Sequence, residues 1–145
     1  MCHMFYGEYS HTMDAKGRVS LPSKFRSRLT GEVMLVKGLD DCVWLFSHEE
    51  YEKFMGSLSQ QEAFDPEARR ARRFFGAGTE EIEIDSAGRI RIPAALREYA
   101  HLSKDITIAG SLDRIEIWDS QRYSAYGEES DINELTAKLS AEGKL

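Results

Sequence analysis

A chemically distinctive turn occurs twice in this sequence. Asp14 and Arg18 enclose "DAKGR", and Asp85 and Arg89 enclose "DSAGR". Arginine forms paired hydrogen bonds with guanine O6 and N7 or with phosphate oxygens, and a neighbouring aspartate can hold its rotamer for that contact. A single D-x-x-G-R sequence is most often an ordinary tight turn with a solvated arginine. The occurrence of two copies is what favours nucleic-acid recognition here.

The similarity between the two copies extends well beyond the turns. From before the turns to the segments just after them, the matched positions are Gly7–Gly78, Gly17–Gly88, Pro22–Pro93 and Arg26–Arg97. After one inserted residue, the matched positions are Gly38–Gly110, Asp41–Asp113, Val43–Ile115, Leu45–Ile117, Phe46–Trp118 and Tyr51–Tyr123. Chance rarely produces so many matches in register, so we interpret the chain as an internal duplication.

Each copy predicts the same series of elements, β-turn-β-α-β-β-α. Alternating residues predict strands at 9–14 and 80–85, and hairpins are predicted at 33–46 and 106–118. A copy of about 45 residues is too short to bury a core of its own. We therefore expect both copies to share one core, with their strands closing or nearly closing a barrel. The predicted class is α+β, mostly β, with peripheral helices.

Two helices are predicted outside the repeated elements. The first has Asp65 as its N-cap and Pro66 at its first position, ends just before Gly76 and carries four arginines. The second places Ile132, Leu135 and Leu139 on one stripe, which leaves packing, a partner contact and a frayed tail as open alternatives. The predicted divisions are a first module at 8–51, a helical linker at 52–77, a second module at 78–123 and an acidic C-terminal helix or tail at 124–145.

Charge is distributed unevenly along the chain. The formal net charge is −6, which is unusual for a nucleic-acid binder unless the positive charge is local. Residues 14–28 contain five basic side chains and one acidic side chain, whereas residues 116–145 contain three basic and seven acidic side chains. In "RVSLP" and "RIRIP" the aliphatic residues alternate with Arg18, Arg89 and Arg91. This alternation predicts that the arginines face solvent.

Other kinds of chemistry have little support in the sequence. The four histidines are scattered without ligand spacing, which predicts no metal site, and no nucleotide-binding glycine pattern is present. Catalysis by Asp14 and Asp85 is disfavoured because each adjacent arginine would keep its aspartate ionised. We expect no enzyme activity, cofactor, small-molecule substrate or membrane span. Cys2 and Cys42 are expected to be reduced thiols, and Met1 and Met4 are alternative starts.

The segments "MFYGEYSHTMDAKGRVSLPSKFR", "RRFFGAG" and "DSAGRIRIP" resemble the bacterial MraZ proteins, which contain two SpoVT/AbrB-type modules. The resemblance implies a swapped-hairpin, double-psi-like barrel formed within one chain. It also implies a ring oligomer and a cytoplasmic, nucleoid-associated transcriptional regulator. Such a regulator would bind short direct repeats in double-stranded DNA upstream of its own division and cell-wall operon.

The motif residues of that family correspond here to Asp14, Arg18, Asp85 and Arg89. Lys16 matches its basic position in the first copy, whereas the second copy has Ala87. The predicted DNA-binding residues are Asp14, Lys16, Arg18, Arg26, Arg28, Asp85, Arg89 and Arg91. The alternative is a protein assembly module in which the arginines form salt bridges between subunits. The residues predicted at a subunit interface are Arg72, Arg73, Phe74 and Phe75.

Overall fold

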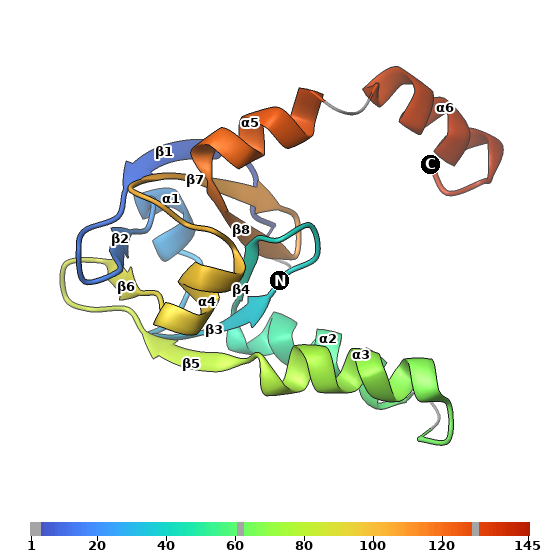
Figure 1. The fold of residues 1–145 in the computed structure, drawn as a ribbon, viewed down its shortest axis with the longest axis horizontal. Helices are drawn as coiled ribbons and strands as arrows, with labels where there is room; N and C mark the ends of the chain where they lie inside the picture. The colour runs from blue at the N-terminus through green and yellow to red at the C-terminus, as the bar shows by residue number, and fades with distance from the viewer. Residues whose placement is uncertain (1–3, 61–62, 129–130) are drawn as a thin grey trace.

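The computed structural model describes residues 4–60, 63–128 and 131–145, and its elements follow the predicted repeat (Figure 1). The first copy consists of β1 (Glu8–Thr12), β2 (Arg18–Ser20), α1 (Ser23–Arg26), β3 (Glu32–Lys37), β4 (Val43–Phe46) and α2 (His48–Ser59). The second copy consists of β5 (Glu80–Glu83), β6 (Arg89–Arg91), α4 (Ala94–Tyr99), β7 (Asp105–Ser111), β8 (Arg114–Asp119) and α5 (Ser120–Glu128). Helix α3 (Pro66–Ala77) joins the copies, and α6 (Ile132–Ala141) follows the second. Cys2 lies outside the described residues.

The strands of the two copies pair across the duplication. Six antiparallel strands form one sheet in the order β1-β7-β8-β4-β3-β5, and β2 and β6 form a separate two-stranded ribbon. The first strand of each copy therefore pairs with the hairpin of the other copy, β1 with β7 and β5 with β3. This arrangement confirms the predicted mixed class and the shared core. Closure into a barrel remains a prediction.

The main core lies between the sheet and the ribbon. The aliphatic residues that alternate with the arginines, Val19, Leu21, Ile90 and Ile92, are each at most 2% exposed. Phe25 of α1 packs edge-on against Phe5 and Tyr9. Each buried aliphatic or aromatic side chain of this kind contributes about 1.5–3 kcal/mol. Burial of one face of the ribbon leaves its arginines on the other face.

A second, aromatic cluster lies beneath α2 and α3. The predicted stripe of α2, which contains Tyr51, Phe54, Met55 and Leu58, packs on Trp44, Phe46 and Phe75. Helix α3 begins as predicted, because the Asp65 carboxylate accepts a hydrogen bond from the Glu67 amide at 3.0 Å. It ends at Ala77 and not before Gly76, which corrects the predicted end. The Phe75 ring is anchored in the cluster, and the Thr79 hydroxyl donates to the Phe75 carbonyl, which supports the two additional residues.

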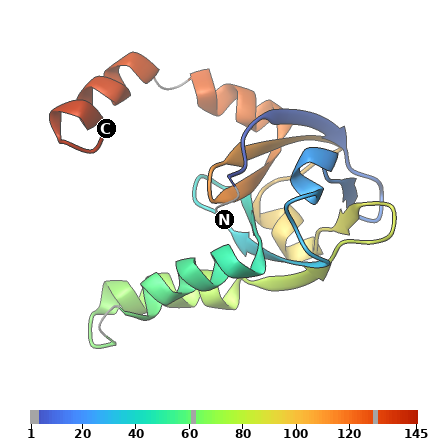
Figure 2. The same cartoon turned by 180° about the vertical axis from the view of Figure 1, so that it is seen from behind.

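The helices project from the body in two directions (Figures 1 and 2). Helices α2 and α3 lie side by side as one arm, and α5 leads to α6 as another, while the turns before β2 and β6 lie at the opposite end of the body. The predicted stripe of α6 is exposed, and no residue of this helix is buried in the described part of the chain. Within the described ranges, the helices lack the length and apolar character required to cross a membrane.

Candidate nucleic-acid interface

The first motif turn is organised by the Asp14 carboxylate. Its Oδ1 accepts hydrogen bonds from the Lys16 amide at 3.0 Å and the Arg18 amide at 2.9 Å, and its Oδ2 accepts one from Arg18 Nε at 2.7 Å. Gly17 completes the turn with φ of 81°, a conformation that strongly favours glycine. The hydrogen bond from the Arg18 amide is the largest cause of a lowered pKa of Asp14, so the carboxylate is ionised near neutral pH.

The second turn repeats this geometry. Asp85 accepts from the amides of Ala87 and Arg89, both at 2.9 Å, and from Arg89 Nε at 3.0 Å. Gly88 has φ of 79°. The Arg89 amide is again the main cause of a lowered aspartate pKa. In both turns the aspartate fixes the guanidinium by holding Nε and leaves the terminal nitrogens for another acceptor.

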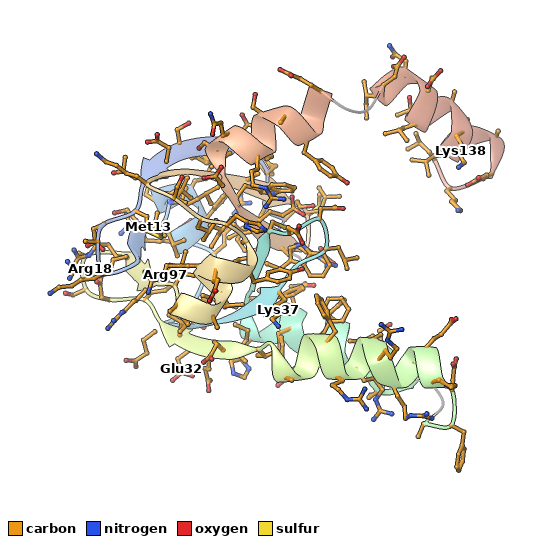
Figure 3. All side chains as sticks on the ribbon, in the orientation of Figure 1. Met13, Arg18, Glu32, Lys37, Arg97 and Lys138 are labelled. Carbon is orange, nitrogen blue, oxygen red and sulfur yellow. The ribbon has the colours of Figure 1, made fainter. Side chains whose placement is uncertain are left out.

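The ribbon brings the arginines of both copies onto one surface. Strand β2 pairs with β6 so that Arg18 lies opposite Arg91 and Ser20 lies opposite Arg89. Side chains opposite each other in an antiparallel pair lie on the same face, and like charges there are unfavourable without a counter-charge. Arg91 has no carboxylate partner among the described residues. The outer face of the ribbon is therefore a cationic strip that can accept an anion (Figure 3, around Arg18).

Each turn is also supported by an arginine of the other copy. A Cβ added to Gly17 would lie 2.8 Å from Arg97 Nε, and one added to Gly88 would lie 2.5 Å from Arg26 Cζ. The Gly17 carbonyl accepts a hydrogen bond from the Ile92 amide at 2.8 Å, and the Gly88 carbonyl accepts one from the Leu21 amide at 3.0 Å. The two turns are thus interlocked as one unit.

Arg97 was not among the predicted binding residues. It could have been included, because it matches Arg26, which was predicted to bind DNA. Its Nε is buried without a hydrogen-bond partner in the described part of the chain. Arg28, a predicted DNA contact, lies against the N-terminal segment. It donates to the Met4 carbonyl and stacks on Tyr6, with its Cζ 5.3 Å from the ring centroid.

The residues predicted at a subunit interface divide into two groups. Phe75 is buried and stacks on Trp44, with ring centroids 5.7 Å apart and planes at 8°, so it serves the core of its own chain. Phe74 is half-buried and packs edge-on against Tyr99. Arg72 and Arg73 are exposed on α3. The arginines are the members of this set that remain accessible.

The fold also brings His48 beside Glu32 and Glu81, from three separate elements, which the spacing of the histidines in the sequence does not show. Their candidate ligand atoms lie within 4.8 Å of one another. A hydrogen bond with Glu81 raises the pKa of Glu32. All three side chains are exposed, and exposed acidic groups often lie together without an ion. The cluster therefore does not establish a metal site.

Comparison with known proteins agrees with this architecture. The family model for the MraZ protein matches twice, over residues 4–74 and 75–142. The transcriptional regulator MraZ of Acetivibrio thermocellus is 45% identical over 130 residues, which cover 90% of this chain and 91% of that protein.

Two further relatives carry the same name. The transcriptional regulator MraZ of Alkaliphilus oremlandii is 42% identical over 142 residues, which cover 97% of this chain and 99% of that protein. That of Thermoanaerobacter sp. strain X514 is 43% identical over 130 residues, which cover 90% of this chain and 91% of that protein. These names describe regulators and not enzymes, in agreement with the prediction of a non-enzymatic chain. The two matched repeats and the relatives together show that this chain belongs to the MraZ family.

Proposed function

We propose that this chain is a transcriptional regulator that binds promoter DNA through the β2–β6 ribbon and its two turns. The observation that carries the proposal is the cationic strip, in which Arg18 lies opposite Arg91 and Arg89 lies opposite Ser20. The major groove of DNA is wide enough for a two-stranded ribbon, and arginine is the side chain best suited to guanine. The names of the relatives support a role in transcription.

We assign the roles of the residues from how firmly their side chains are held by neighbouring groups. Arg18 and Arg89 are the proposed base readers, because Asp14 and Asp85 hold their guanidinium groups and reduce the rotamer entropy lost on binding. Lys16 and Arg91 are exposed and are proposed phosphate contacts. Arg26 is proposed both to support the Gly88 turn and to contact phosphate, and Arg28 to contact phosphate at the margin of the surface.

We further propose that the crossed strand pairing forms a closed swapped-hairpin barrel and that several chains assemble into a ring. A ring would present many ribbons to short direct repeats, and linked sites gain effective concentration even when each makes few contacts. The proposed target is the DNA upstream of the chain's own division and cell-wall operon, with the protein associated with the nucleoid. The acidic C-terminal part would keep DNA on the ribbon side.

The test is the affinity of Arg18→Ala and Arg89→Ala for that upstream DNA, measured by fluorescence anisotropy. We expect each variant to lose about 1–3 kcal/mol, or roughly 5- to 150-fold in affinity. Lys138→Ala is the charge-matched control, because Lys138 lies at the other end of the molecule (Figure 3). Unchanged affinity in both arginine variants would refute the proposal. Dissociation of the oligomer in these variants would instead favour the assembly module.

A further inference from the structure

The aromatic cluster of the first copy holds a guanidinium group. Arg114 of β8 lies over the rings of Trp44, Phe46 and Phe54, with Cζ 4.3, 4.9 and 5.2 Å from their centroids. Asp113 accepts from Arg114 Nε at 2.8 Å and from Nη2 at 3.0 Å. Stacking on aromatic rings combined with a paired carboxylate is a strongly favourable environment for arginine.

The second copy keeps two of the three rings, has Glu116 at the position of Trp44, and lacks the arginine. Trp118 matches Phe46 and Tyr126 matches Phe54, and the two rings lie 5.4 Å apart. Cys42 occupies the position that corresponds to Arg114. It is fully buried, its Sγ donates to the Leu39 carbonyl, and its short side chain cannot lie over these rings.

A pocket of about 370 Å³ lies over the second set of rings. The residues that line it are Asp40, Glu116, Trp118, Tyr123, Ser124, Tyr126 and Gly127. Glu116 is fixed between two indoles, since it accepts from Trp118 Nε1 at 3.0 Å and from Trp44 Nε1 at 3.2 Å. Asp40 accepts from the Tyr126 hydroxyl at 2.8 Å. The pocket therefore combines aromatic faces with carboxylates, the two kinds of group that hold Arg114 between the rings and Asp113.

We propose that this pocket binds a guanidinium group from α3 of a second copy of the chain. Three exposed arginines of that helix, Arg70, Arg72 and Arg73, have no ion pair with a carboxylate in the described part of the chain. Helices α3 and α5 belong to different arms (Figures 1 and 2), so a second copy supplies the arginine. The inference rests on the self-association part of the proposed function and is independent of DNA binding.

Gly127→Arg tests the proposal by supplying a guanidinium from the chain itself. A Cβ at Gly127 meets no atom within 4 Å, so the variant is expected to fold, and its Tm and circular dichroism check this. By sedimentation velocity, we expect its self-association to be at least tenfold weaker than that of the unsubstituted protein. Gly127→Gln, which has a long neutral side chain, is the matched control and should assemble normally.

The triple variant Arg70→Gln, Arg72→Gln and Arg73→Gln tests the donor helix. It should weaken assembly to the same degree as Gly127→Arg, and combining both changes should cause little further loss, because they remove one contact. Three outcomes would each overturn the proposal. They are additive losses of self-association in the combined variant, normal assembly of Gly127→Arg, and a monomeric unsubstituted protein. The proposed pocket contact would be supported if these variants lose assembly but still bind normally to a duplex that carries a single site. Absence of DNA binding by the unsubstituted protein would refute only the DNA proposal.

Discussion

The two copies agree at the motif turns and differ beneath the helices. At the turns, both aspartates hold two amides and an arginine Nε, and both glycines have φ near 80°. In the aromatic clusters, one copy stacks Arg114 on its rings, whereas the other has a pocket lined by Trp118 and Tyr126. The comparison shows that the backbone geometry of the motif turns is the same in the two halves. Side-chain chemistry differs where they face different surroundings.

The largest expected effect is the loss of stability when alanine replaces either turn glycine. It tests whether the neighbouring atoms constrain the two turns equally. Alanine at either glycine must adopt a positive φ, which costs roughly 1–2 kcal/mol. At Gly17 the new Cβ also lies 3.0 Å from the Ile92 carbonyl and against Arg97, whereas at Gly88 its nearest neighbours belong to the exposed side chain of Arg26. We therefore expect Gly17→Ala to lower the free energy of unfolding by about 3 kcal/mol and Gly88→Ala by about half as much. Equal losses in urea denaturation would contradict this asymmetry.

The next effect concerns the arginine that only the first aromatic cluster contains. Arg114→Met should lower the free energy of unfolding by about 2 kcal/mol, because it removes a shielded cation–π contact and leaves Asp113 without its partner. Chemical denaturation followed by tryptophan fluorescence measures the change. Arg91→Met is the control, since its side chain is exposed, and it should change stability by less than about 0.5 kcal/mol.

A smaller effect, on DNA affinity and its salt dependence, concerns the difference between Lys16 in the first turn and Ala87 in the second. Lys16→Ala should weaken DNA binding several-fold and reduce the dependence of log affinity on log salt by about one phosphate contact, a slope change of roughly 0.9. Ala87→Lys should increase that slope by a similar amount if the turns approach DNA symmetrically. Affinity titrations at several salt concentrations measure both. No change in slope for Lys16→Ala would show that Lys16 does not contact phosphate.

The smallest effect is the pH dependence that Tyr123 of the second copy contributes to stability. Burial, followed by the hydrogen bond to Glu8, raises the pKa of Tyr123 to about 12. A raised folded-state pKa stabilises the protein below the ordinary tyrosine value near 10, and that contribution is lost as pH rises from about 10 to 12. Tyr123→Phe should remove this part of the stability loss. The measurement is the free energy of unfolding between pH 9 and 12, and an identical profile in the variant would contradict the assignment.

Local patterns predicted much of the fold. Asp65 and Pro66 start α3, and the stripe from Tyr51 to Leu58 packs on the core, because capping and helical periodicity depend on neighbouring residues. The aspartate–arginine turns were also predictable, since every hydrogen bond that the Asp14 and Asp85 carboxylates accept spans four residues or fewer. The end of α3 was not, because Phe75 is held by packing against Trp44.

The amino-acid sequence by itself determined the duplication, the order of elements and the two motif turns, all of which depend on short-range preferences and repeated spacing. Tertiary structure alone decided that Arg97 supports the turn at Gly17 and that Arg114 covers the first aromatic cluster but not the second. These contacts join segments far apart in the chain. Their partners depend on which strands pair and in what register, and that pairing is selected by burial of the shared core.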